Sequence, residues 1–187
     1  MIAAAILACA VHVAPTTMDA IVRVESGGDA LALNVNHLAG PQPHAATVQE
    51  AAVIIRRYMA AGYTVDIGYS QLDSANLARL GYTVEDALDD CKNIAGGGAI
   101  LSGFYGKAVQ QFGEGQRALM AALSGYNTGD PQRGFANGYV GKYYINATLP
   151  PAPLPARIAG ALTWPAAAPV ASIQVYVRPG LSLAPSH

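Results

Sequence analysis

The sequence has few charges, few cysteines and no long apolar run, and each of these shortages excludes a class of protein. Charged residues make up 12% of the 187 residues, and 11 Lys and Arg against 12 Asp and Glu leave a net charge of −1. That balance excludes a broad basic surface for nucleic acid. The longest run of purely apolar residues, Met1–Val11, is well short of the roughly 20 residues that a membrane-spanning helix needs. Two cysteines are too few for a zinc site built from thiolates.

Apolar residues, by contrast, are abundant. They make up 52% of the chain, and there are also 20 glycines. This composition excludes a disordered polyampholyte, and the length fits one domain with a sizeable core plus a tail. We therefore expect a soluble domain rich in alanine and glycine.

The N-terminal segment and the pair of cysteines each leave alternatives open. Met1–Val11 has the small and apolar residues of a signal peptide, but the first basic residue is Arg23, so we expect this segment to form the first helix of the fold. Cys9 and Cys91 either form one disulfide or remain two buried thiols. A disulfide would require an oxidising compartment such as the periplasm.

Start and stop signals predict a mainly helical chain up to residue 148. They favour a helix that begins at Pro15–Asp19 with a hydroxyl cap and ends before Ser26–Gly28, a helix from a capping box at Thr47–Glu50 to Gly62, a short helix opened by Thr83–Asp86, and helices over residues 92–112, 116–124 and 139–146. Three glycines in the longest helix, Gly96–Gly98, predict close packing against another backbone. Only Tyr63–Ile67 looks extended. The predicted fold class is mainly α (α+β), a compact helical domain with a small β element.

The chain changes character near Pro150. The last 38 residues hold 8 of the 12 prolines and no acidic residue, so regular structure is expected to stop there. We therefore divide the chain into a domain over residues 1–148 and a Pro/Ala-rich tail over 149–187. Within the tail, Ser172–Val177 alternates like a short strand and, with Trp164, suggests a segment that docks on a partner.

Glu25 is the strongest candidate for a catalytic residue. It follows Ile21 and Val22 on the apolar face of its predicted helix and lies at the C-terminal end. Burial and the helix dipole both disfavour a carboxylate there, so the pKa of Glu25 is expected to be raised toward that of a general acid. The alternative is an ordinary ion pair of Glu25 with Arg23 or Arg56.

Two polar segments carry further candidates. Asp66–Asn76 is rich in hydrogen-bonding groups, and within it Gly68 permits a close backbone approach while Gln71 offers both a donor and an acceptor. In Ser124–Gly129, Tyr126 and Asn127 can contact a sugar ring and its amide substituent. Taken singly, these segments also fit an ordinary turn and a helix C-cap.

Together and in this order, the three motifs are much more specific. Glu25-Ser26-Gly27, Gly68-Tyr69-Ser70-Gln71 and Tyr126-Asn127-Thr128-Gly129 resemble the motifs of the family 1 lytic transglycosylases, which have a lysozyme-like fold. Four more segments, Ala20–Asp29, Leu33–Asn36, Val65–Gly68 and Asp73–Leu77, are similar to the transglycosylase subunit of type IV secretion and conjugation systems. Cys9 and Cys91 match paired positions of that branch. The resemblance spans about Leu7–Tyr144.

The resemblance implies roles for single residues. Glu25 matches the one catalytic acid/base, Gln71 a residue that lines the cleft, and Tyr126 the tyrosine that contacts the catalytic carboxyl. Ser26, Gly68 and Asn127 match sugar-contacting or supporting positions. The implied reaction cleaves the β-1,4 bond between N-acetylmuramic acid and N-acetylglucosamine with a 1,6-anhydro product and no cofactor. The resemblance also implies a periplasmic protein whose partners are glycan strands and, through the tail, other components of the secretion system.

Departures from the family pattern keep other functions open. Many relatives have Asn where this chain has Asp73, so Asp73 and Asp66 are candidates for a second carboxylate that would support hydrolysis. A wall-binding scaffold with the same fold is a further alternative. The insertion Asn36–His44 is expected to form a loop over the cleft, with His37 and His44 in solvent and no metal site.

Overall fold

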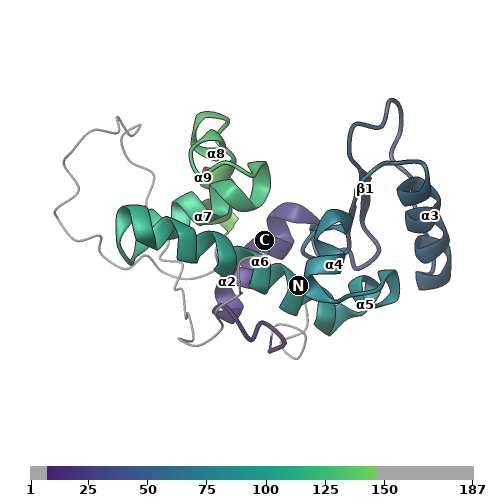
Figure 1. Cartoon of the computed structure of the whole chain (residues 1–187), viewed down its shortest axis with the longest axis horizontal. Helices are drawn as coiled ribbons and strands as arrows, with labels where there is room; N and C mark the ends of the chain where they lie inside the picture. The colour runs from purple at the N-terminus through teal and green to yellow at the C-terminus, as the bar shows by residue number, and fades with distance from the viewer. Residues whose placement is uncertain (1–7, 147–187) are drawn as a thin grey trace.

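The computed structural model describes residues 8–146, shown in colour in Figure 1. Its elements, in chain order, are α2 (Pro15–Glu25), β1 (Leu33–Val35), α3 (Val48–Ala60), β2 (Val65–Ile67), β3 (Leu72–Asp73), the 3-10 turn η1 (Ser74–Asn76), α4 (Leu77–Leu80), α5 (Val84–Leu88), α6 (Asp90–Phe112), α7 (Gln116–Thr128), α8 (Arg133–Ala136) and α9 (Tyr139–Asn146). The predicted mainly α (α+β) class is confirmed.

Two predictions concern the chain ends. Of the helix expected over Met1–Val11, residues 1–7 lie outside the described residues, and Ala8–Val11 form turns rather than helix. The tail over 149–187, including Trp164 and Ser172–Val177, also lies outside the described residues. No helix within residues 8–146 is long and apolar enough to cross a membrane.

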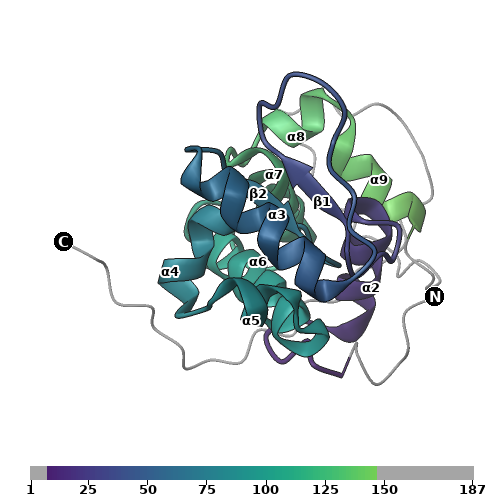
Figure 2. The same ribbon diagram turned by 90° about the vertical axis from the view of Figure 1, so that its right-hand side faces the viewer.

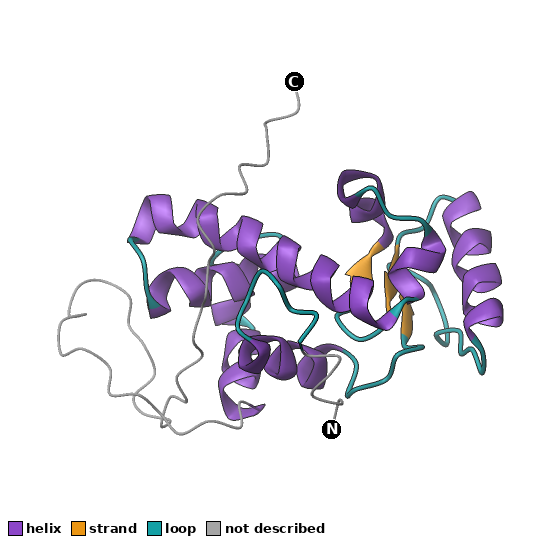
Figure 3. Ribbon diagram, turned by 90° about the horizontal axis from the view of Figure 1, so that it is seen from below, coloured by secondary structure: helices purple, strands orange, loops and turns teal. Residues whose placement is uncertain are grey.

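The sheet is small and antiparallel, with strand order β1-β2-β3 (Figure 3). Its register pairs Asn34 with Asp66, and Asp66 with Asp73, which places three polar side chains in a row across the three strands. Only β2 was predicted. β2 lies within the longer extended run Tyr63–Ile67, whereas β1 and β3 have three and two residues, in which an alternating pattern does not stand out from the surrounding loops.

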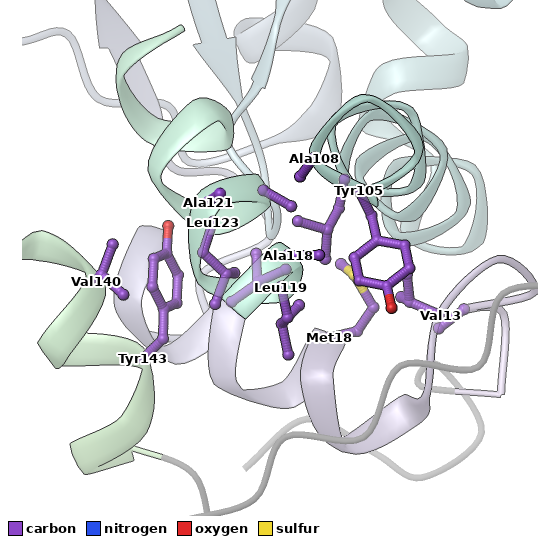
Figure 4. Close-up of a cluster of buried hydrophobic side chains, with 14 of the residues drawn as sticks. Val13, Met18, Tyr105, Ala108, Ala118, Leu119, Ala121, Leu123, Val140 and Tyr143 are labelled. Carbon is purple, nitrogen blue, oxygen red and sulfur yellow. The ribbon is translucent and has the colours of Figure 1, made fainter. Parts of the chain in front are cut away.

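The domain has two hydrophobic cores. The first joins α2, α6, α7 and α9 and includes Met18, Leu119 and Tyr143 (Figure 4). The second lies between the sheet, α3 and α5, and Figure 2 shows α3 beside the strands. Phe104 and Tyr126 pack against both cores. We call the elements around the first core the helical lobe and those around the second core the sheet lobe. Because α6 contributes to both cores, it holds the two lobes together.

The helix ends follow the predicted signals in part. At α5, Thr83 and Asp86 form the full capping box. At α3, the Thr47 side chain accepts from the backbone N–H of Glu50, but the Glu50 carboxylate accepts from Ala46, so only half of the predicted box exists. Glu50 thus accepts from the amide of Ala46, the residue before the N-cap, instead of from the amide of the N-cap itself.

The predicted hydroxyl cap of α2 is wrong. Its N-cap is Ala14, which has no side-chain hydrogen bond, and Pro15 begins the helix. Pro15 lacks an N–H group, so one amide that would need a cap is absent. Asp19 lies beyond the first turn and instead forms an ion pair with Arg23 at 2.8 Å.

The glycines of α6 admit side chains rather than another backbone, which corrects the prediction for Gly96–Gly98. A Cβ atom on Gly97 would lie 2.6 Å from the Cβ and Oγ atoms of Ser70 and 3.0 Å from the Tyr126 hydroxyl. Because Gly97 has no side chain, Ser70 and the Tyr126 hydroxyl can approach the backbone of α6. α7 also extends to Thr128, four residues beyond the predicted end, so Tyr126 lies in its last turn.

A disulfide joins Cys9 to Cys91 and decides between the two alternatives for the cysteines. It ties the segment before α2 to the start of α6 across 82 positions of sequence. In the chain-entropy model, a cross-link over such a loop stabilises the fold by about 4–5 kcal/mol.

We predict that Gly97→Ala destabilises the protein whereas Gly106→Ala, in the same helix, does not. The Cβ atom at Gly97 meets Ser70 at 2.6 Å, but a Cβ atom at Gly106 meets nothing within 4 Å. Overpacking costs about 1–3 kcal/mol, and the gain in helix propensity is about 0.5–1 kcal/mol. Thermal unfolding should show a Tm lowered by roughly 2–4 °C or more for Gly97→Ala and unchanged or raised for Gly106→Ala. Equal Tm values for both variants would show that the Ser70 contact is not tight.

Candidate active site

A cleft of about 960 Å³ lies between the two lobes. Glu25 lines it at the end of α2. The sheet lobe contributes Asn34, Asn36, His37, Thr64, Asp66, Gln71, Asp73, Asn76 and Arg79, and the helical lobe contributes Phe104, Tyr126, Asn127, Thr128, Arg133 and Tyr139. The cleft is therefore rich in amides, hydroxyls and aromatic rings, and it also holds three carboxyl groups. This combination suits a carbohydrate, whose hydroxyl groups need donors and acceptors and whose ring faces pack on aromatic rings.

Two tyrosines of α9 hold the Glu25 carboxyl group. Tyr143 donates its hydroxyl to Oε1 at 2.5 Å, and Tyr139 donates to Oε2 at 3.1 Å. The ion pair considered as an alternative does not form, because Arg23 pairs with Asp19 and Arg56 with Glu85. Each oxygen of Glu25 thus has one neutral donor.

Burial raises the pKa of Glu25 above its ordinary value, and this is the largest effect. The hydroxyls of Tyr143 and Tyr139 oppose it by stabilising the carboxylate, and Asp66 adds to it through charge repulsion. The net direction is upward, which confirms the direction expected from the sequence. A raised pKa keeps a larger fraction of this carboxyl protonated near neutral pH, as a general acid requires.

One loop joins the three sequence motifs. The Ser26 hydroxyl donates to the Tyr69 carbonyl at 2.8 Å, and the Tyr126 hydroxyl donates to the Ser70 carbonyl at 2.7 Å. Gln71 folds back and donates its side-chain amide to the Gly68 carbonyl at 3.0 Å. Three successive carbonyls thus accept from the three motifs.

Buried Asn93 holds the same loop from behind. Its side-chain amide donates to the carbonyls of Ile67 and Ala87, and its Oδ1 accepts from the backbone N–H of Ser70. Gly68 has φ +66°, and a Cβ atom there would lie 2.8 Å from Asn93 Nδ2. Only glycine fits both the conformation and the space. Asn93 was not singled out from the sequence, because one asparagine inside a helix carries no local signal of its partners.

The cleft contains six of the eight predicted site positions: Glu25, Asp66, Gln71, Asp73, Tyr126 and Asn127. Ser26 and Gly68 do not line it, and they support the loop instead. The Tyr126 hydroxyl donates to the Ser70 carbonyl, so the contact of Tyr126 with the carboxyl of Glu25 stays a prediction.

The two candidate second carboxylates have different surroundings. Asp66 accepts from the side-chain amides of Asn34 at 3.0 Å and Asn36 at 3.2 Å, and burial raises its pKa despite these donors. Asp73 accepts from the backbone N–H of Ala75 and caps η1. Asp66 thus accepts from two side chains beside the cleft, whereas Asp73 accepts from the backbone at the start of η1.

The insertion Asn36–His44 reaches the cleft only at its start. Asn36 and His37 line the cleft, but His44 does not and is exposed. Within the described residues, no group of three His, Cys, Asp or Glu side chains could hold a metal ion.

Sequence reasoning missed several functional side chains. Tyr139 and Tyr143 lie four residues apart, so the predicted helix over 139–146 already placed them on one face. Asn34 and Asn36 were noted only as part of a family motif, because β1 was not predicted. Neither pair could be assigned to Glu25 or Asp66 without the tertiary structure.

We predict opposite shifts of the Glu25 pKa for two variants, measured by ¹³C NMR titration of the side-chain carboxyl. Tyr143→Phe removes a donor that stabilises the carboxylate, so the pKa should rise. Asp66→Asn removes a repelling charge, so it should fall. Tyr63→Phe, on the outside of the sheet lobe, is the control and should leave it unchanged. Shifts of the same sign for the first two variants would contradict the assigned causes.

Comparisons with known proteins identify the family of the chain. The family model "Transglycosylase SLT domain" matches residues 3–148. Protein virB1 of Rhizobium radiobacter is 38% identical over 134 residues, covering 72% of this chain and 55% of that protein. Protein virB1 of Agrobacterium fabrum is 37% identical over 149 residues (80% and 60%), and the type IV secretion system protein virB1 of Brucella abortus is 36% identical over 155 residues (78% and 63%). No solved structure matches significantly.

The chain spans just over half of the length of these curated relatives, 55–63%. The family match, however, covers the whole part of the chain in which the cleft and its residues lie. The chain therefore belongs to the transglycosylase SLT domain family.

Proposed function

We propose that this protein is a peptidoglycan lytic transglycosylase in which Glu25 is the single acid/base. The observation that carries this proposal is the position of Glu25: a carboxyl group with a raised pKa that lines a large polar cleft and is held on both oxygens by tyrosine hydroxyls. A raised pKa keeps the group protonated and able to act as an acid, and the same hydroxyls stabilise the carboxylate that remains after the proton is given up.

The proposed reaction needs only this one carboxyl group. Protonated Glu25 donates to the oxygen that bridges N-acetylmuramic acid and N-acetylglucosamine, and the glycosidic bond breaks. The acetamido group or the C6 hydroxyl of the muramic acid stabilises the positive charge at C1. The Glu25 carboxylate then takes the proton of the C6 hydroxyl as that oxygen bonds to C1, which leaves a 1,6-anhydro ring. Glu25 ends protonated, and no water is consumed.

The cleft walls supply groups that suit such a strand. Asn127 offers an amide for the N-acetyl groups and hydroxyls, and Gln71, whose amide nitrogen donates to the carbonyls of Ala32 and Gly68, offers its side-chain oxygen as an acceptor. Phe104 offers an aromatic face on the helical side. Ser26 and Gly68 would act by holding the loop that carries Gln71, rather than by touching the substrate.

Hydrolysis is the second candidate, because Asp66 faces the cleft and is close enough to Glu25 to raise its pKa. A carboxylate that activates water would give a reducing muramic end instead of the anhydro ring. A binding scaffold is less favoured, since burying a carboxyl group costs stability that a binder has no reason to sacrifice.

We further propose that the protein works in the periplasm, where it opens the wall for a type IV secretion or conjugation apparatus. The Brucella abortus relative is named a type IV secretion system protein, which supports a role with such an apparatus. The disulfide Cys9–Cys91 supports an oxidising compartment. The tail over 149–187 is proposed to contact other components of the apparatus.

The test of the reaction is mass spectrometry of the products released from purified sacculi by wild type and Glu25→Gln. Gln keeps the size of the side chain and loses the titrating proton, so activity should fall about 10²-fold or more. Glu114→Gln, on an exposed turn, is the matched control and should keep full activity. Anhydro-muropeptides from wild type support the transglycosylase. Reducing ends that vanish in Asp66→Asn would assign a hydrolase, and binding without any release would favour the scaffold.

Removal of residues 149–187 should leave sacculus cleavage by the purified protein within about twofold and should reduce recruitment of the protein to the secretion apparatus. The cleft residues all precede residue 149, so they do not depend on the tail. Recruitment can be measured by co-purification with the assembled complex and by the efficiency of transfer. If assembly and transfer are unchanged in the truncated protein, the tail has no partner there.

A further inference from the structure

Two arginines flank the cleft, one from each lobe. Arg79 belongs to α4 on the sheet side, and Arg133 begins α8 on the helical side. Both side chains line the cleft, and both residues are exposed to solvent. Neither has a place in the reaction proposed above, which uses a single carboxyl group and neutral amides.

Neither Arg79 nor Arg133 belongs to the ion pairs of the described residues, which include Arg23 with Asp19, Arg56 with Glu85 and Lys92 with Asp86. Arg79 donates to the neutral side-chain oxygen of Asn76 at 3.1 Å.

Arg133 attracts Asp130, but this attraction stops short of an ion pair. Oδ1 of Asp130 accepts instead from the backbone N–H groups of Gln132 and Arg133, at 2.8 and 2.9 Å. The guanidinium groups of Arg79 and Arg133 therefore keep donors that can bind a ligand.

The chemistry of a guanidinium group indicates what that ligand is. It presents a rigid fork of N–H donors that matches a carboxylate in two-point geometry, and such charge-assisted bonds are about twice as strong as neutral ones. Sugar hydroxyls and acetamido groups do not need a charged donor, because Asn127 offers a neutral amide in the same cleft. An anionic group on the substrate, away from Glu25, is the ligand that fits.

We propose that Arg79 and Arg133 bind carboxylates of the peptide stems on the glycan strand, so that the cleft selects strands that carry acidic peptides over bare or neutralised ones. The inference rests on the proposed function, because it takes a peptidoglycan strand as the occupant of the cleft. The two arginines act as specificity-determining residues and take no part in bond cleavage. Their positions on opposite lobes let a single strand be held through stems on either side of the scissile bond.

The test compares native sacculi with sacculi whose stem carboxylates have been converted to amides by carbodiimide coupling with ammonia. A second comparison uses glycan strands stripped of their peptides. Binding is measured by co-sedimentation and cleavage by mass spectrometry, for the full chain of wild type, the double variant Arg79→Gln/Arg133→Gln and the control Arg57→Gln. Arg57 is exposed on α3, away from the cleft, so its loss removes one positive charge elsewhere, half of the change in the double variant. Tm values check that all variants are folded.

Wild type and Arg57→Gln should bind native sacculi at least about tenfold more tightly than amidated sacculi or stripped strands. The double variant should lose this preference, with a raised KM on native sacculi and an unchanged kcat. Equal binding of native and amidated sacculi by wild type would overturn the inference, as would a double variant that keeps the preference. Charge-dependent binding without any cleavage product would refute the proposed function alone, and cleavage without charge-dependent binding would refute this inference alone.

Discussion

The cleft depends on one loop, Gly68–Gln71, whose backbone carbonyls accept hydrogen bonds from distant parts of the chain. Ser26 binds it from the end of α2 and Tyr126 from the last turn of α7. These bonds fix where α2 ends relative to the sheet, and therefore where Glu25 points. Buried carbonyls must be paired, so each of these donors is required by the loop as much as by the cleft. The three motifs of the sequence are thus one hydrogen-bonded assembly, only part of which faces a substrate.

The raised pKa of Glu25, the proposed acid/base, makes the stability of the fold depend on pH. This pKa is raised in the folded state, so the folded protein binds the proton more tightly than the unfolded chain does. The resulting stabilisation is fully present below the unfolded pKa and is lost as the pH rises through the folded pKa. Tyr139 and Tyr143 limit this loss by donating to the carboxylate. Their rings also pack edge to face at 5.5 Å, so one helix face supplies both the donors and their support.

Helices with start and stop signals were the most predictable part of the fold. The start and stop signals of α3, α5, α6 and α9 lie in the sequence within a few residues of the observed ends. The short strands β1 and β3 were not predictable, since two or three residues show no period and their register is set by β2. The partners of the glycines in α6 were likewise hidden, because Ser70 and Tyr126 come from elements far away in sequence.

The sequence by itself determined that Glu25 is an acid on the apolar face of a helix end, because helical spacing and a stop signal are local properties. It also determined the order of the three motifs and the helix that carries Tyr139 and Tyr143. Only the tertiary structure decided that these tyrosines, and not an arginine, bind the carboxyl group. It also decided that Ser26 supports the loop instead of lining the cleft. Such choices depend on which groups meet across more than 40 residues of chain, and local patterns of sequence carry no information about distances of that kind.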